Sequence, residues 1–274
     1  MNKGDLLEKI IIDLEKIKQE KPLIHHLTNY VSANDSANIT LSLGASPVMA
    51  DNPAEVEEVI ALAGALVLNI GTIGQGKEGG FFKAVRKANQ LNIPVVLDPV
   101  GVGASSFRKK VVQELLEKNR IEVIKGNLAE IKSILEIPTK VRGVDSADES
   151  KDNQKIAQKM AETYRLISVI TGEEDVISDG EEIITVKHGH PLMGQLTGTG
   201  CMTTSLIGCF LAVEGKPLIA ATGGVLLMGL AGEKAAARAS GPGSLRWRLQ
   251  DEIYKIRGSR IKKLAEIGKI NLHL

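Results

Sequence analysis

Short runs of branched apolar residues alternate along the chain with longer segments in which apolar residues recur at helical spacing. The short runs predict strands and the longer segments predict amphipathic helices. The predicted strands are Ala65–Ile70, Pro94–Asp98, Glu122–Lys125, Leu166–Thr171 and Ile183–His188. The predicted helices are Pro53–Leu62, Gly80–Leu91, Ser106–Lys118, Leu128–Leu135 and Glu149–Tyr164. This alternation is typical of an α/β protein, so we expect a largely parallel central sheet flanked by helices.

The two ends of the chain carry further helical patterns. Near the N-terminus, apolar residues at helical spacing predict an amphipathic helix rather than an export signal: Leu6, Ile10, Leu14 and Ile17. Two apolar segments, Cys201–Val213 and Leu218–Ala239, predict helices that close the core, and the charged segment Arg246–Ile267 predicts a helix outside it. No linker or repeat divides the chain, so we expect one domain over residues 1–274, with its most mobile loop at Arg142–Glu149.

Composition excludes several classes of partner. Lys plus Arg number 34 and Asp plus Glu number 33, so no net charge draws the chain toward nucleic acid or an acidic membrane surface. The apolar tract Pro217–Ala231 contains three glycines and is shorter than the roughly 20 residues of a membrane span. Two cysteines, Cys201 and Cys209, lie too far apart on one predicted helix for a disulfide, which fits a cytoplasmic protein.

The segment Thr197–Cys201 is a glycine-rich turn that leads into an apolar helix. Backbone N–H groups at such a turn converge on one point and favour a phosphoryl group. We therefore expect Gly198, Thr199 and Gly200 to hold the transferring phosphoryl group, with Cys201 facing it from the first helical turn. A free cysteine is more often a small core residue, and that interpretation is the better one for Cys209.

Polar and small residues follow the predicted strands, where ligands of parallel sheets bind. They are Asn69, Gly71, Asp98, Lys125, Asn127, Glu130 and Thr171. The carboxylates Asp98 and Glu130 are the oxygen ligands that Mg²⁺ prefers, and Lys125 is a cation for phosphate. Taken singly, Asp98 before a proline also shapes a turn, and Glu130 with Asn127 also caps a helix. Two carboxylates after adjacent strands favour a shared Mg–ATP site.

In the order and spacing of its motifs, the sequence resembles the hydroxyethylthiazole kinases of the ribokinase-like superfamily. The motifs are Pro22–His25, Thr28–Val31, Leu43–Ala50, Ala65–Thr72, Val96–Gly103, Gly126–Glu130, Arg142–Ser146, Gly198–Cys201 and Gly241–Ser244. The resemblance implies ATP-dependent phosphorylation of the primary alcohol of 4-methyl-5-(2-hydroxyethyl)thiazole, which supplies thiamine synthesis by salvage. It also implies a homotrimer with active sites between subunits.

The resemblance also assigns roles to individual residues, by their positions in the matching motifs. The resemblance implies ATP contacts at Lys125, Asn127 and Thr171, and thiazole contacts at Asn29, Val31, Met49, Gly71 and Gly198. Cys201 stands where relatives in the superfamily have an aspartate base. An unperturbed thiol is mostly protonated at neutral pH, but a helix N-terminus lowers its pKa, so we expect a modest base. His26, Tyr30 and Lys125 depart from the family's usual residues, and a lysine in place of arginine loses the planar fork.

Other classes of function remain open at this point. The run Gly71–Lys77 satisfies the first seven positions of a P-loop, but Glu78 replaces the hydroxyl residue that holds Mg²⁺. The pair Gly101 and Gly103 is only a fragment of a dinucleotide-binding motif, because the third glycine is missing. A thiazole-binding module without activity and a related hydroxymethylpyrimidine or sugar kinase are further alternatives, although such kinases would carry aspartate at Cys201.

Overall fold

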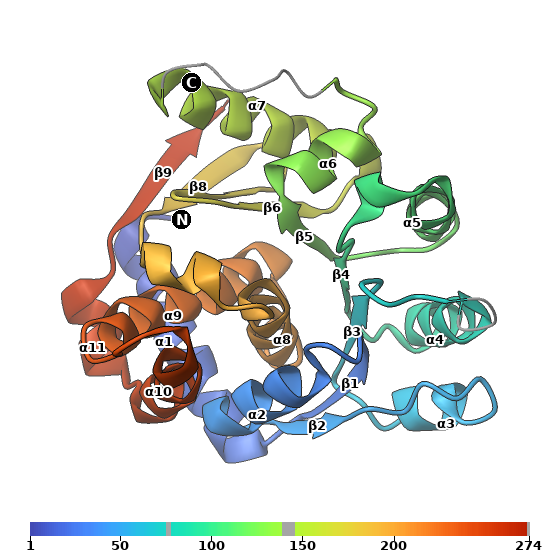
Figure 1. Ribbon diagram of the computed structural model, residues 1–274, viewed down its shortest axis with the longest axis horizontal. Helices are drawn as coiled ribbons and strands as arrows, with labels where there is room; N and C mark the ends of the chain where they lie inside the picture. The colour runs from blue at the N-terminus through green and yellow to red at the C-terminus, as the bar shows by residue number, and fades with distance from the viewer. Residues whose placement is uncertain (75–77, 139–145, 273–274) are drawn as a thin grey trace.

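A mixed sheet forms the centre of the structure, a computed structural model that describes residues 1–74, 78–138 and 146–272. Within these ranges nine strands lie in the order β2-β1-β3-β4-β5-β6-β7-β8-β9 (Figure 1). The strands are β1 Leu23–Leu27, β2 Ser46–Val48, β3 Ala65–Asn69, β4 Val95–Asp98, β5 Val123–Asn127, β6 Ile167–Thr171, β7 Asp175–Ser178, β8 Glu182–Val186 and β9 Ile267–Asn271. The pairs from β2 to β6 are parallel, and those from β6 to β9 are antiparallel. The largely parallel sheet that we predicted is confirmed.

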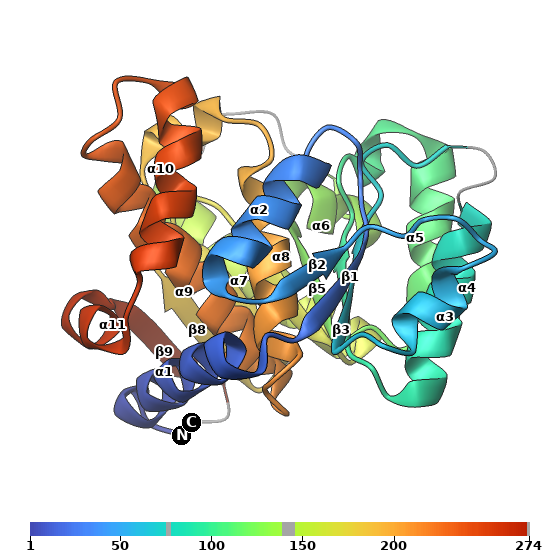
Figure 2. The same ribbon diagram turned by 90° about the horizontal axis from the view of Figure 1, so that it is seen from below.

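Helices cover both faces of this sheet (Figures 1 and 2). One face carries α3 Val56–Ile60, α4 Glu78–Leu91, α5 Ser106–Lys118, α6 Leu128–Ile134 and α7 Ser146–Tyr164. The other carries α1 Lys3–Glu20, α2 Ala33–Leu43, α8 Thr199–Leu211, α9 Pro217–Ala236, α10 Pro242–Lys255 and α11 Gly258–Leu264. Because each face of the strands is apolar and buried, the fold has one hydrophobic cluster on each side of the sheet.

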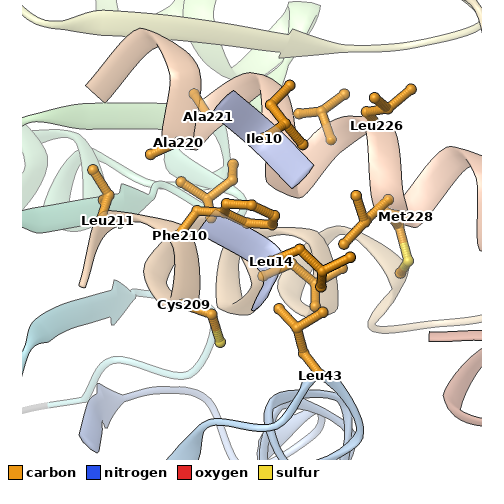
Figure 3. Close-up of a cluster of buried hydrophobic side chains, with 14 of the residues drawn as sticks. Ile10, Leu14, Leu43, Cys209, Phe210, Leu211, Ala220, Ala221, Leu226 and Met228 are labelled. Atoms are coloured by element: carbon orange, nitrogen blue, oxygen red, sulfur yellow. The ribbon is translucent and has the colours of Figure 1, made fainter. Parts of the chain in front are cut away.

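The helices α8 and α9 form the centre of the larger cluster (Figure 3). Phe210 and Cys209 of α8 are fully buried there, so the core role predicted for Cys209 is confirmed. The 20 residues of α9 are long and apolar enough to cross a membrane, longer than the tract we identified. However, 89% of its most apolar window is buried in the structure, so α9 is a core helix.

All five predicted strands are present, but β1, β2, β7 and β9 were missed because they are short or lie in polar sequence. The prediction of one helix over Arg246–Ile267 was wrong. The backbone becomes extended at Ile256 and Arg257, which separates α10 from α11, and β9 then pairs with β8. That pairing depends on a strand about 80 residues away in the chain, which no local pattern reports.

The loop predicted to be mobile, Arg142–Glu149, lies partly outside the described residues. Residues 142–145 are not described, and Ser146–Glu149 form the start of α7 rather than a loop.

Candidate active site

Four polar residues from separate elements meet beneath the first turn of α8. β3 ends at Asn69 and β4 ends at Asp98, and the parallel register places these two residues side by side. Lys125 comes from the next strand, β5, and Cys201 from α8, which packs on β3 and β4. The predicted convergence of residues that follow the strands is therefore present for Asn69, Asp98 and Lys125, and Cys201 joins them from the helix.

The glycine turn needs its glycines for two different reasons. Gly198 is the N-cap of α8 and has a φ of 87°, in the left-handed region that side chains disfavour. A Cβ on Gly200 would lie 2.8 Å from Lys125 Nζ, so the absence of a side chain admits the lysine. The N–H groups of the first turn of an α-helix have no intrahelical acceptor. Those of Thr199, Gly200 and Cys201 are therefore available to an anion placed at the turn.

Cys201 is held by two amide side chains. Asn69 Nδ2 donates to its Sγ at 3.1 Å, and Asn29 Nδ2 does so at 3.5 Å. Burial raises the pKa of the Cys201 thiol, the Asp98 carboxylate raises it further, and weaker effects that include the Lys125 charge oppose them. We expected the helix N-terminus to give this thiol a lowered pKa, but its net pKa lies above the ordinary value, because burial of the thiolate is the largest effect on it. Cys201 is therefore protonated at neutral pH.

Asp98 is fully buried and has one oxygen without a hydrogen bond. Its Oδ2 accepts from Asn69 Nδ2 at 3.0 Å and from Thr204 Oγ1 at 2.9 Å. Its Oδ1 lacks a hydrogen-bond partner in the described part of the chain, and lies 3.6 Å from Lys125 Nζ. Burying a carboxylate costs free energy unless a cation compensates its charge, so the burial of Asp98 and the burial of Lys125 each require the other residue.

Lys125 keeps its charge although it is only 4% exposed. Burial lowers its pKa, but the nearby Asp98, Cys201 and Glu130 raise it by more, so the net pKa lies above the ordinary value. A buried ammonium group therefore sits directly under Gly200. This arrangement supplies a fixed positive charge at the glycine turn.

Glu130 and Asn127 form a capping box at the start of α6. Asn127 Oδ1 accepts from the Glu130 N–H at 2.9 Å, and Glu130 Oε2 accepts from the Asn127 N–H at 2.8 Å. The other oxygen, Oε1, accepts from the N–H of Gly101 at 2.9 Å. Both carboxylate oxygens of Glu130 thus hold loop backbone together. Within the described residues, no group of three or more His, Cys, Asp or Glu side chains is arranged around a common metal position.

The predicted thiazole contacts separate into two sets. Asn29 is buried, donates to Asn69 Oδ1 at 2.8 Å and to Cys201 Sγ, and lies against Gly71. Val31 and Met49 instead lie at the surface, with 55% and 37% of their area exposed. One chain thus brings Asn29, Gly71 and Gly198 to the thiol and leaves Val31 and Met49 open to solvent.

A cleft of about 820 Å³ adjoins the glycine turn, because Thr199 and Gly200 are part of its lining. Its lining includes Thr171, Asp175, His188, Thr199, Gly200 and Met228. Thr171 therefore lies in the same cleft as the turn. Burial raises the pKa of Asp175 to about 7, against the opposing effects of the Gly172 N–H and the Lys125 charge. The cleft thus contains a carboxyl group that titrates near neutral pH.

Comparison with known proteins decides the family. The model of the hydroxyethylthiazole kinase family matches residues 14–259. The chain belongs to the hydroxyethylthiazole kinase family. A relative of that name from Alkaliphilus metalliredigens is 50% identical over 246 residues, 89% of this chain and 90% of its own length. The structure of a hydroxyethylthiazole kinase protein from Pyrococcus horikoshii aligns with a TM-score of 0.90 at 39% identity, covering 96% of this chain and 100% of that chain.

A more distant likeness places the fold. A ribokinase-like superfamily protein from Enterococcus faecalis aligns with a TM-score of 0.67 at 13% identity, over 94% of this chain and 96% of that chain. At this identity the likeness concerns the fold alone, and it agrees with the predicted ribokinase-like architecture.

Membership of the hydroxyethylthiazole kinase family leaves the rival classes without support. The P-loop run includes residues 75–77, so its lysine, Lys77, lies outside the described residues. Of the glycine pair, Gly101 donates its N–H to Glu130, and Val102–Ala104 form a short 3-10 helix. A dinucleotide site instead needs a glycine turn that opens directly into a long helix, and α5 begins only at Ser106.

Sequence reasoning missed three residues of the site. Asn69 was noted after its strand without a role, although its position beside Asp98 follows from the strand ends. Asp175 and His188 follow β6 and β8, and His188 Nδ1 donates to Glu233 Oε1 at 2.8 Å. Inspection of the residues after the predicted strands would have found Asp175, and His188 is itself the last residue of a predicted strand.

Proposed function

We propose that the protein transfers the γ-phosphoryl group of ATP to the primary hydroxyl of 4-methyl-5-(2-hydroxyethyl)thiazole, a salvage step for thiamine synthesis. The observation that carries this proposal is the glycine turn of α8 between two sides of one site. On one side lie Cys201 and Asn29, and on the other lies the cleft with Thr171. A hydroxyl acceptor and a nucleotide would meet at the turn.

The turn and Lys125 supply the charge stabilisation in this proposal. Phosphoryl transfer passes through a loose transition state, so catalysis depends on neutralising oxygen charge and on in-line positioning. The free N–H groups of Thr199, Gly200 and Cys201 donate to the transferring oxygens, and the positive end of α8 adds to them. Lys125 lies under Gly200 and remains protonated, so its charge is present throughout the transfer.

Cys201 orients the acceptor hydroxyl in this proposal, and it is a poor base. Its raised pKa leaves little thiolate at neutral pH, so the hydroxyl proton is lost late, as a loose transition state permits. Turnover of Cys201→Ala tests the role, because a rate equal to that of the parent would rule it out. Cys201→Asp restores the base that relatives in the superfamily carry, and a higher turnover would show that proton transfer limits the parent.

ATP-dependent transfer implies a divalent metal, and we infer that it is Mg²⁺. The residues fit in part, because the buried Asp98 Oδ1 lacks a hydrogen bond in the described structure. Asp98 would hold the ion, and Glu130 would join it by releasing a backbone N–H. When bound, the ion would neutralise the phosphate oxygens. Activity titrated with Mg²⁺ in Asp98→Asn and Glu130→Gln tests both roles, and an unaltered metal dependence would contradict them.

A homotrimer with sites between subunits accounts for the exposed thiazole contacts. Val31 is 55% exposed and Tyr30 is 79% exposed, although both lie beside the buried Asn29. A second subunit that covers this surface would bury these residues and complete the thiazole pocket. Sedimentation of the purified protein tests this arrangement, and a monomer at assay concentrations would contradict it.

The two cysteines of the chain are free thiols, which fits the reducing cytoplasm as the compartment of such an enzyme.

Transfer of radiolabelled phosphate from ATP is the decisive test of the function. The assay uses the thiazole alcohol, a hydroxymethylpyrimidine and a sugar alcohol as acceptors, each with Mg²⁺. We expect label on the thiazole alcohol and little on the others. Binding of the thiazole alcohol without transfer would show a binding module, and preference for another acceptor would show a different kinase of the same fold.

A further inference from the structure

Asn69 connects both halves of the site, although the proposed chemistry gives it no role. It is the last residue of β3 and only 2% of its area is exposed. Its Oδ1 accepts from Asn29 Nδ2 at 2.8 Å and from the N–H of Gly71 at 2.9 Å. Its Nδ2 donates to Asp98 Oδ2 at 3.0 Å and to Cys201 Sγ at 3.1 Å. One amide thus uses both acceptor positions and both donor hydrogens.

The orientation of this amide is fixed by its neighbours. The Gly71 N–H can only donate, so the atom that faces it must be the oxygen of Asn69. The opposite atom then faces the Asp98 carboxylate, which accepts, and must be the nitrogen. A flipped amide would place N–H against N–H and oxygen against a buried carboxylate. The Asn69 nitrogen therefore always points at Asp98 and Cys201.

This geometry links the thiol to the carboxylate. The Asn69 nitrogen donates to both the Asp98 carboxylate and the Cys201 thiol. A hydrogen bond donated to sulfur stabilises the thiolate and fixes the side chain at the same time. We propose that Asn69 is the positioning residue of this site, whose shared amide holds Cys201 toward the acceptor hydroxyl and keeps Asp98 in place. The proposal rests on the proposed function for its effect on turnover.

Two substitutions separate the donor of Asn69 from its acceptor. Asn69→Ala removes both. Asn69→Asp keeps an oxygen for the Gly71 N–H and Asn29, and replaces the nitrogen that faces Asp98 and Cys201. Asn69→Asp also adds a negative charge beside Asp98, so its effect is compared with that of Asn69→Ala, which removes the donor without adding charge. If the nitrogen matters, both variants will change the reactivity of the thiol. An unchanged thiol in Asn69→Asp would show that the nitrogen does not act on it.

The first measurement is the rate at which iodoacetamide alkylates Cys201 as a function of pH, with the site of reaction verified by peptide mass spectrometry. Cys209 is fully buried and its pKa is raised to about 12, so it will not react in the folded protein. Loss of the donor will raise the pKa of Cys201, and a rise of one unit slows alkylation roughly tenfold at a given pH. This readout needs no kinase activity.

The second measurement is turnover. We expect kcat to fall at least roughly tenfold in Asn69→Ala while the KM for ATP changes less than about twofold, because the substitution leaves the nucleotide cleft intact. For Asn69→Asp we expect a similar loss of kcat at about pH 9, because the carboxylate cannot donate to Cys201. The same two substitutions at Asn52 are the matched control, since Asn52 is exposed and its side chain accepts from the Ala54 N–H.

The outcomes distinguish this proposal from the function on which it rests. An inactive parent with shifted alkylation profiles would refute the kinase and support the Asn69 contact with the thiol. An active parent whose alkylation profile and kcat match those of Asn69→Asp at about pH 9 would overturn the positioning role. Thermal unfolding of each variant shows that it is folded, and Asn69→Asp carries the test if Asn69→Ala does not fold.

Discussion

The substitution Gly198→Ala tests whether the turn before α8 must adopt its left-handed backbone. Gly198 has a φ of 87°, where a residue with a Cβ is disfavoured. A Cβ there would also lie 3.2 Å from Ser32 Cβ and 3.5 Å from Asp35 Oδ2. Asp35 cannot move freely, because its Oδ1 accepts from Arg246 Nε at 2.6 Å. The added methyl group therefore meets both a strained backbone and a fixed neighbour.

The magnitude follows from these two effects. The left-handed conformation costs roughly 1–2 kcal/mol for a residue with a side chain. The contact with Ser32 is tight but not overlapping, so it adds a smaller cost. We expect the free energy of unfolding to fall by about 1–2 kcal/mol, which lowers Tm by about 2–4 °C per kcal/mol in a domain near this size.

Turnover should respond more strongly than stability. If the turn relaxes to relieve the strain, the N–H groups of Thr199 and Gly200 move away from the transferring phosphoryl group. Loss of one preorganised donor of this kind lowers kcat by roughly a hundredfold or more. The KM for the thiazole alcohol should change less, because Asn29 and Cys201 keep their contacts.

Urea denaturation and steady-state kinetics of Gly198→Ala test whether the turn requires glycine, and Gly215→Ala is the control variant. Gly215 is exposed, has no positive φ, and an added Cβ there meets nothing within 4 Å. The control should keep the stability and turnover of the parent. Equal stability and equal kcat in the two variants would refute the argument that the turn requires glycine at Gly198.

Two further predictions concern charge. Asp175 has a pKa raised to about 7 by burial, so it is mostly neutral below that pH and ionised above it. Ionisation in the cleft repels the phosphates of ATP, so the KM for ATP should rise as pH increases through about 7, and Asp175→Asn should remove this rise. A pH-dependent KM that survives in the variant would contradict the assignment. Because the folded protein disfavours the ionised form, stability should also fall as pH rises from the ordinary pKa of 3.8 to about 7, which thermal unfolding of parent and variant will compare. Lys125→Met should destabilise the fold by about 3–5 kcal/mol in urea denaturation, because it leaves the buried Asp98 uncompensated. Adding Asp98→Asn should recover much of that loss, and a double variant no more stable than Lys125→Met would show that the pair is not coupled.

Local sequence patterns were enough to predict the parallel strands β3 to β6 and the position of the glycine turn, but not the parallel strands β1 and β2. Asp98 and Lys125 lie at the ends of neighbouring parallel strands, so their convergence follows from the direction of the sheet. The cysteine in the first turn of α8 follows from the apolar helix that the turn precedes. β9 could not be predicted in this way, because it forms only by pairing with β8.

The chemistry of individual groups was harder to predict than their place in the chain. Glu130 follows its strand as expected, yet both of its oxygens bind loop N–H groups, a fact that depends on where Gly101 lies. Asn69 carried no sequence signal beyond its position, although it contacts Asp98 and Cys201 together.

The residues alone indicated the family, the polar groups that gather where the parallel strands end, and a thiol at the positive end of a helix. Folding reversed one expectation about that thiol. The helix end, which lowers the pKa of Cys201, is encoded by a few adjacent residues. Burial and the Asp98 carboxylate, which raise it, come from β3, β4 and the loop at Asn29, more than 100 residues away in the chain. Desolvation depends on everything packed around a group, so the pKa of Cys201 became known only with the fold.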